Sequence, residues 1–264
     1  MRRVSFSAPE WIRCVRNGNS GDTEAMHKIE ICNDSFALMS QMADGSYDVI
    51  ITDPPYAAEV QDNMCSGSLA GVKSVPKYQL SFAPLTQRHW IVDAVRITQR
   101  WVISFCGVEE FGRYQDILGK KYVRGAIWAK PNSMGQLTAD RPATSYEGVV
   151  CCHDLDIKKR WNGRGSYGIW FCNGTRGLRD RHPNEKPLEL CLKLVSLFSE
   201  RGETVFDPFC GSGAIGEACV RLGRNYVGLD SDPQWVDRAS ARLSTDLESV
   251  SDEYALGLCR AWGR

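Results

Sequence analysis

The feature that most constrains the fold is a glycine-rich turn between a predicted strand and a predicted helix. The stretch is TVFDPFCGSGAIGEACVRLG, in which Gly211, Gly213 and Gly216 satisfy the pattern G-x-G-x-x-G. Glycine lets a backbone turn tightly and approach a ligand closely, and the start of the next helix offers free N–H groups. The following strand, YVGLD, ends at Asp230, whose carboxylate can accept hydrogen bonds from ribose hydroxyls. The turn therefore predicts a β-α-β unit with a nucleotide-like ligand, and a tight turn without any ligand is the alternative.

Strand and helix patterns alternate along most of the remaining chain. Apolar runs of strand length are separated by stretches whose apolar residues recur at helical spacing. The predicted strands are 28–32, 47–52, 101–105, 122–130, 204–207 and 226–230, and the predicted helices are 35–42, 85–98, 109–119, 186–200, 214–223 and 232–243. This succession predicts a doubly wound α/β fold with a mostly parallel sheet that helices cover on both faces.

The segment 131–183 interrupts this alternation. It is rich in Gly, Asn, Ser, Thr and Arg, and within it only EGVVCC and YGIWF are typical of strands. We interpret it as a small insertion, and we expect the acidic tail after Ser244 to be peripheral. The predicted division of the chain is an N-terminal lead-in (1–27), a first half (28–130), the insertion (131–183), a second half (184–244) and a C-terminal tail (245–264).

Composition argues against several classes of protein. The 32 basic and 32 acidic residues give a net charge of +0, so any nucleic-acid signal must be local. The 11 cysteines are odd in number and form no C-x-x-C pair, which predicts reduced thiols instead of a disulfide framework. No signal-like apolar region and no run of about 18 apolar residues occurs. We therefore expect a cytoplasmic protein with no membrane partner.

A second motif, DPPY, closes the apolar strand YDVIIT. It consists of Asp53, Pro54, Pro55 and Tyr56. Ligands of doubly wound sheets bind at the carboxyl ends of the strands. Each proline fixes its own φ and extends the residue before it, so the Asp53 carboxylate and the Pro54 carbonyl become stiffly held acceptors. Such a pair can accept both hydrogens of an exocyclic amino group, and Tyr56 offers a flat face to a base. The alternative is a structural diproline loop.

Two further stretches, IWAKPN…SYEGVV and HPNEKPLEL, accompany the longer strings NDSF…YDVIITDPPY and VFDPFCGSGAIGEAC…GRNYVGLDSDPQW. Together they resemble the DNA methyltransferases that methylate amino groups with S-adenosylmethionine, in the permuted order with the catalytic half first. The resemblance covers about residues 28 to 244. It implies a circularly permuted, Rossmann-like methyltransferase fold with a catalytic half, a target-recognition insertion and a cofactor-binding half. The chain departs from the family pattern at Asn184-Glu185, Ala214-Ile215 and Asp230.

The resemblance also implies a role for each matching residue. The implied catalytic residues are Asp53, Pro54, Pro55 and Tyr56. The implied cofactor-binding residues are Asp34, Asp53, Lys186, Pro187, Asp207, Phe209, Cys210, Gly211, Gly213 and Asp230. Among them, Asp34 is expected at the adenine amino group of the cofactor, Asp230 at its ribose and Lys186 near its methionine end.

Positive charge gathers between residues 157 and 182. The basic residues that we expect to bind DNA are Lys158, Lys159, Arg160, Arg164, Arg176, Arg179 and Arg181. The aromatic residues interleaved with them are Trp161, Tyr167, Trp170 and Phe171. Such a segment can neutralise phosphates, and arginine can read guanine edges. A solvated basic surface is the alternative.

Histidines and cysteines in and beside this segment do not have the spacing of a zinc site, so we expect no metal. The residues concerned are Cys151, Cys152, His153, Cys172 and His182. Methylation at carbon 5 of cytosine generally uses a Pro-Cys pair, and no proline of the chain precedes a cysteine. The cysteines are therefore expected to be structural.

The function predicted from these features is site-specific methylation of the exocyclic N6 of adenine, flipped out of a DNA duplex. In the resembling family DPPY accompanies adenine more often and SPPY cytosine, so methylation of cytosine N4 is the alternative. Two alternatives belong to other classes: a catalytically inactive DNA-binding or assembly subunit, and a dinucleotide-binding oxidoreductase. Too few residues follow Asp230 to complete the latter. A homodimer and a cognate restriction enzyme are left open as partners.

Overall fold

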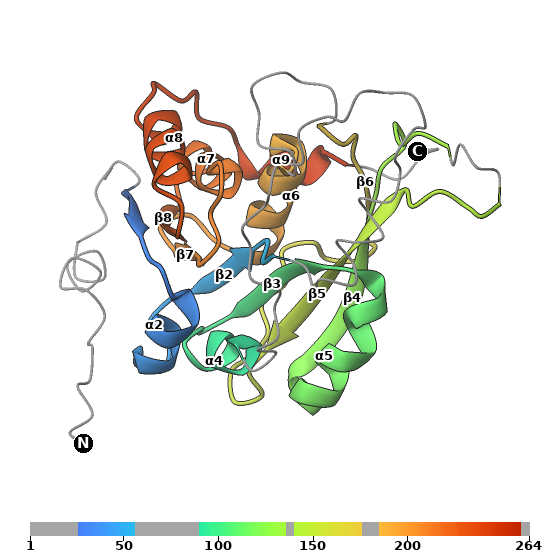
Figure 1. Cartoon of the computed structure of the whole chain (residues 1–264), viewed down its shortest axis with the longest axis horizontal. Coiled ribbons are helices and arrows are strands. Elements are labelled where there is room, and N and C mark those ends of the chain that lie inside the picture. Colours follow the sequence, from blue (N-terminus) through green and yellow to red (C-terminus); the bar gives the residue numbers. More distant parts are fainter. Residues whose placement is uncertain (1–25, 56–89, 136–139, 176–184, 260–264) are drawn as a thin grey trace.

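The computed structural model describes residues 26–55, 90–135, 140–175 and 185–259 (Figure 1). Most of the lead-in, the residue Tyr56 with the segment up to 89, and residues 176–184 lie outside this part. None of the helices in the described part combines the length and the apolar character that a membrane span needs.

The described strands form one sheet in the order β1-β8-β7-β2-β3-β5-β4-β6. They are β1 (His27–Ile31), β2 (Val49–Thr52), β3 (Trp101–Cys106), β4 (Tyr122–Ala129), β5 (Tyr146–His153), β6 (Ile169–Phe171), β7 (Thr204–Asp207) and β8 (Asn225–Asp230). Neighbouring strands are parallel except where β5 pairs antiparallel with β3 and β4. The prediction of a doubly wound, mostly parallel sheet is confirmed.

Helices lie on both faces of the sheet, as Figure 1 shows. The helices α2 (Ser35–Gln41), α4 (Trp90–Arg96) and α5 (Phe111–Leu118) cover one face, and α6 (Leu188–Phe198), α7 (Ala214–Arg221), α8 (Pro233–Leu243) and α9 (Asp252–Gly257) cover the other. Short 3-10 turns at Val108–Glu110 and Gly119–Lys121 flank α5. Val49 and Ile51 belong to the core beneath α6, and Ile50 belongs to the core beneath α4. Because alternate side chains of β2 are buried on opposite faces, Val49, Ile50 and Ile51 are all apolar.

The predicted insertion is only partly outside the sheet. Its strand β5 lies between β3 and β4, and β6 forms the edge beyond β4. Both strands that the sequence predicts within 131–183 are thus part of the main sheet, and hydrogen bonding to β3 and β4 makes β5 an internal strand.

The C-terminal tail also differs from expectation. Helix α9 packs on α6, and Ala255 is fully buried between them. Asp252 pairs with Arg224, whose side chain is only 1% exposed, at 2.7 Å between Oδ1 and Nη2. The expectation of a peripheral tail is therefore wrong for α9, which supplies the counter-charge of a buried arginine.

Candidate active site

The glycine turn joins β7 to α7 at the carboxyl edge of the sheet. Gly211 and Gly213 have φ values of 47° and 77°, in the left-handed region that favours glycine. A Cβ on Gly213 would lie 2.9 Å from that of Ala239 in α8, whereas a Cβ on Gly211 would meet nothing within 4 Å. Gly213 is therefore needed for close packing of α8, and Gly211 leaves the turn open to a ligand.

Asp230 connects this turn to the end of β8. Its Oδ2 accepts a hydrogen bond from the Gly211 N–H at 2.9 Å, and its Oδ1 accepts one from the Asp232 N–H at 3.0 Å. Burial nevertheless raises the pKa of the Asp230 carboxyl above its ordinary value. Since a carboxylate oxygen has two lone pairs, each oxygen can accept one more hydrogen bond. The carboxylate is thus fixed beside the turn and still able to bind hydroxyl groups.

Asp207 lies below the turn and is 1% exposed. Its carboxylate accepts hydrogen bonds from Thr52 Oγ1 at 2.7 Å, from the Phe209 N–H at 3.2 Å and from the Tyr226 hydroxyl at 3.1 Å. Burial, partly offset by these hydrogen bonds, raises the pKa of the Asp207 carboxyl to about 7. The structure thus places Asp207 in the frame of the site, where it ties β2, β7 and β8 together.

Cys210 is also turned away from the open side of the turn. Its side chain is 6% exposed and leaves no room for a Cβ on Gly228, which would lie 2.9 Å from the Cys210 Cβ. Burial raises the pKa of the Cys210 thiol well above its ordinary value, so the thiol stays protonated and unreactive.

Aromatic rings lie beside the glycine turn. The Phe209 ring centroid is 5.4 Å from that of Phe36 in α2 and 5.9 Å from that of Trp90 in α4. Asp34 caps the start of α2, where its exposed carboxylate accepts a hydrogen bond from the Ala37 N–H at 2.9 Å. Phe209 and Asp34 were expected here from sequence. Phe36 and Trp90 were not, because apolar residues on amphipathic helices are ordinarily core residues.

Asp53 follows β2 on the same edge, with the buried Pro54 and half-buried Pro55 after it. The Lys186 ammonium lies 2.6 Å from Asp53 Oδ2 and is 6% exposed. Pro187, directly after it, is the residue that precedes α6. The structure therefore brings Lys186 to the predicted catalytic carboxylate, although the two residues are far apart in sequence.

A second carboxylate at this edge was missed in the sequence. Glu147 Oε2, at the start of β5, lies 3.2 Å from the Lys186 ammonium, and its Oε1 accepts a hydrogen bond from the Lys130 ammonium. Although burial lowers the pKa of Lys186, the charges of Asp53 and Glu147 raise it above its ordinary value overall. The available signal was a single charged residue within the apolar run YEGVVCC.

Residues of the stretch WAKPN, at the end of β4, form hydrogen bonds with the residues that follow β6. The Trp128 indole N–H donates to the Cys172 carbonyl at 2.8 Å. The Asn132 amide donates to the Gly174 carbonyl at 2.9 Å and accepts from the Gly174 N–H at 2.8 Å. This stretch therefore holds the chain that leaves β6 against the catalytic edge.

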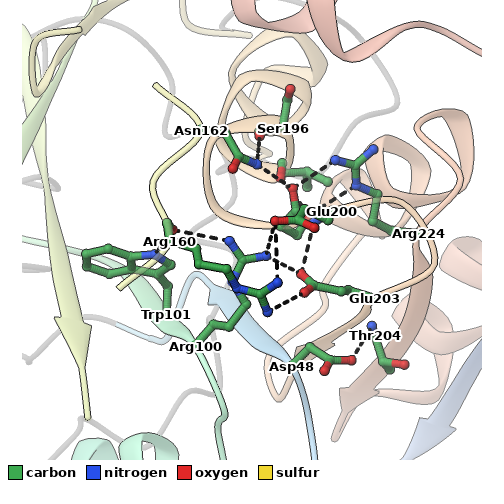
Figure 2. A network of polar contacts seen from close by, with 12 residues as sticks. Asp48, Arg100, Trp101, Arg160, Asn162, Ser196, Glu200, Glu203, Thr204 and Arg224 are labelled. Carbon is green, nitrogen blue, oxygen red and sulfur yellow. Dashed lines mark hydrogen bonds and ion pairs between the residues drawn. The ribbon is translucent and has the colours of Figure 1, made fainter. Parts of the chain in front are cut away.

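The first part of the basic segment lies at the opposite end of the sheet. Arg160 pairs with Glu203 at 3.1 Å, and its carbonyl accepts a hydrogen bond from the indole of Trp101, the first residue of β3, at 2.6 Å (Figure 2). Six residues of β3 span about 17 Å between its two ends. Lys158, Lys159 and Arg164 are exposed in the same connection. The structure thus does not bring these four basic residues to the predicted catalytic edge.

The aromatic residues interleaved with the basic ones differ in burial. Trp170 is 2% exposed in β6 and belongs to the core, and the half-buried Trp161 packs against the core with its ring 5.0 Å from that of Phe198 in α6. Tyr167 is 67% exposed.

Arg176, Arg179 and Arg181 lie outside the described residues. The described residues on either side of them, Thr175 and Glu185, are joined by a hydrogen bond of 2.7 Å from the Thr175 hydroxyl to the Glu185 carbonyl. Glu185 directly precedes Lys186, so the described residues on either side of 176–184 both lie at the catalytic edge.

Comparisons with known proteins agree with this geometry. The sequence profile of the DNA methylase family matches residues 47–241. The Type II methyltransferase M2.DpnII of Streptococcus pneumoniae is 25% identical over 246 residues, which cover 84% of this chain and 91% of the relative. The solved structure of the M1.HpyAVI–SAM complex matches with a TM-score of 0.61 and 22% identity over 83% of this chain and 100% of that one. PvuII DNA methyltransferase, described as cytosine-N4-specific, matches with a TM-score of 0.62 and 14% identity over 89% of this chain and 92% of that one. These two structures confirm the predicted fold.

Proposed function

Because the chain belongs to the DNA methylase family, we propose that it transfers the methyl group of S-adenosylmethionine to the exocyclic N6 of adenine in DNA. The observation that carries this proposal is the position of Asp53. It is held by Lys186 at the carboxyl edge of β2, next to the strand that leads into the glycine turn.

The residues at the turn fit the cofactor. S-adenosylmethionine, when bound, supplies a methyl group on a positively charged sulfur. The open side of Gly211, the oriented carboxylate of Asp230 and the half-buried ring of Phe209 suit a backbone contact, a ribose and an adenine ring, respectively. Asp34, exposed at the start of α2, retains acceptor capacity for an amino group. Asp207 and Cys210 support the turn from below instead of facing the cofactor.

The target amine is a poor nucleophile because its lone pair is delocalised into the ring of the base. The Asp53 carboxylate and the Pro54 carbonyl are two acceptors on a stiff turn, and they can draw both amine hydrogens out of the ring plane. The lone pair would then be localised on nitrogen and available to the methyl group that the bound cofactor would supply. The sulfur would keep the electron pair of its bond to that methyl group, and the amine would lose one proton to solvent. Positive charge grows on that nitrogen, and Asp53 is placed to stabilise it. Tyr56 is proposed to stack on the flipped base.

DNA contacts are proposed for the second part of the basic segment. Arg176, Arg179 and Arg181 connect Thr175 to Glu185, both of which lie at the catalytic edge. The positions of Lys158, Lys159, Arg160 and Arg164 at the opposite end do not support the prediction that they contact DNA around the target base.

The test is incubation of the purified protein with tritium-labelled S-adenosylmethionine and unmethylated DNA, followed by nucleoside digestion and mass spectrometry. N6-methyladenine is the expected product. N4-methylcytosine would retain the mechanism and overturn the base. Cofactor binding without transfer to any DNA would favour the inactive-subunit alternative, and absence of cofactor binding would overturn the proposal altogether.

A further inference from the structure

Lys186 lies between two carboxylates that come from different parts of the sheet. Its ammonium is 2.6 Å from Asp53 Oδ2, after β2, and 3.2 Å from Glu147 Oε2, at the start of β5. The side chains of Lys186 and Glu147 are only 6% and 9% exposed. A buried ammonium requires compensating charge and hydrogen bonds, and both carboxylates provide them here.

Glu147 is in turn shared by two lysines. Its other oxygen accepts a hydrogen bond from Lys130, at the end of β4. Four charges of alternating sign therefore follow one another along the catalytic edge, in the order Asp53, Lys186, Glu147 and Lys130. Removing the charge of Glu147 would leave two neighbouring lysines without the carboxylate that separates them.

Aromatic rings also lie beside the two lysines. The Lys186 ammonium lies 4.8 Å from the ring centroid of Phe105 and 5.9 Å from that of Trp128, and the Lys130 ammonium lies 4.4 Å from that of Trp128. Cation–π contacts of this kind favour the ammonium at a defined place. Lys186 is thus fixed from several directions while it contacts Asp53.

We infer that Glu147 is a positioning residue of the methyl-transfer reaction: it holds Lys186 in place and charged, so that Lys186 fixes the orientation of the Asp53 carboxylate. The inference rests on the proposed function, in which Asp53 accepts the target amine. Glu147 acts on Asp53 through Lys186 and need not touch substrate itself. Its effect is expected through the position of Asp53, since a misplacement of about 1 Å in an active site can reduce the rate up to roughly a hundredfold.

The experiment compares Glu147→Gln and Glu147→Asp with wild type in single-turnover methylation of DNA. Glu147→Gln keeps the shape and loses the charge, and we expect its rate constant to fall by about tenfold or more. With one carboxylate fewer, the Lys186 ammonium should also lose its proton more readily. We therefore expect the rate of Glu147→Gln to decline at a lower pH than the rates of wild type and Glu147→Asp.

Glu203→Gln is the matched control. Glu203 also lies between two cations, Arg100 at 2.5 Å and Arg160 at 3.1 Å, but at the opposite end of the sheet. Both glutamine variants leave cations undercompensated, so both should unfold more easily. All rates are therefore referred to the folded fraction measured by circular dichroism. A merely structural role of Glu147 predicts equal rates and equal pH profiles for the two variants, and that result would overturn the inference.

A crystal structure of Glu147→Gln supplies a readout that does not depend on activity. We expect the Lys186 ammonium or the Asp53 carboxylate to be displaced by about 1 Å or more. An unchanged Lys186–Asp53 pair would reject the positioning role even if the rate fell. If wild type methylates no DNA, the proposed function fails, and the crystal structure alone then decides whether Glu147 positions Lys186.

Discussion

The two ends of the sheet both carry a glutamate between two cations, but the cations differ. At the amino end Glu203 pairs with Arg100 and Arg160, as Figure 2 shows, and at the carboxyl end Glu147 pairs with Lys130 and Lys186. Arginine presents a rigid fork of donors that can hold several partners at once, whereas lysine is a point charge on a flexible stem. The amino end is therefore built to join segments of chain, and the carboxyl end to place one ammonium beside one carboxylate.

The arginines of the amino end demonstrate this joining. Arg100 contacts Glu203 and the Arg160 carbonyl, and so connects the start of β3 to the loop before β7 and to the basic connection after β5. Arg224 donates to Asp252 and to the Ser199 carbonyl, and so attaches α9 to the end of α6. A network with this many partners should contribute to stability and not to catalysis.

The largest effect is expected from a substitution at the carboxyl end of the sheet, where catalysis is proposed. Asp53→Ala removes the carboxylate that accepts the target amine, so we expect methyl transfer to fall by about 1,000-fold or more. Cofactor binding, measured by isothermal titration calorimetry, should remain close to wild type. Retention of most of the activity would contradict the assignment of Asp53.

Glu203→Gln tests the structural side. Arg100 is 1% exposed and would keep only the longer ion pair with Glu200, at 3.5 Å, as a charged partner among the ion pairs described for it. Because breaking a buried ion pair leaves an undercompensated charge, the free energy of unfolding should fall by about 3 kcal/mol. Urea titration measures this loss, and the methylation rate per folded molecule should stay unchanged. If Glu203→Gln were as stable as wild type but methylated DNA more slowly, Glu203 would have a role in catalysis instead of stability.

The pH dependence of stability tests the buried carboxyl of Asp207 beneath the glycine turn. Burial raises the pKa of Asp207 to about 7 in the folded protein, against about 3.9 in an unfolded chain. Between these values the folded protein binds the extra proton, so stability from this group is full below about pH 4 and is lost as the pH rises towards 7. Asp207→Asn should remove this contribution.

The comparison of urea unfolding between wild type and Asp207→Asn isolates that contribution. We expect the wild-type free energy of unfolding to decline relative to that of the variant by up to about 1.4 kcal/mol per pH unit within the window. Parallel pH profiles for the two proteins would show that Asp207 titrates normally.

Much of the carboxyl edge could be predicted because its residues stand in continuous motifs. The glycine turn, Asp230 and the strand before Asp53 are local patterns with local reasons, namely positive φ at Gly211 and apolar side chains buried on both faces of β2. The place of β5 could not be predicted, because an apolar strand does not encode its direction or its neighbours. Glu147 was missed for the same reason, since its two lysines come from β4 and from the chain before α6.

The basic segment shows how sequence adjacency misleads. A count of charges between residues 157 and 182 adds together residues that precede β6 and residues that follow it. Strand β6 runs parallel to β4, so the chain before it lies towards the amino end and the chain after it leaves at the carboxyl end. The described residues before and after β6 therefore lie towards different ends of the sheet, although the sequence counts their neighbours as one basic segment.

The smallest expected effect is on the salt dependence of DNA binding, and it distinguishes the two parts of the basic segment. Charge reversal of Arg176, Arg179 and Arg181 should make the dependence of DNA affinity on salt shallower by about 0.9 for each phosphate that the protein no longer neutralises. Reversal of Lys158 and Lys159, which are exposed at the opposite end, should leave the salt slope as in wild type. Fluorescence anisotropy with labelled duplex DNA at several salt concentrations measures both. Equal changes for the two sets would mean that DNA reaches both ends of the sheet or senses only total charge, and a change confined to Lys158 and Lys159 would place the DNA at the amino end, away from Asp53.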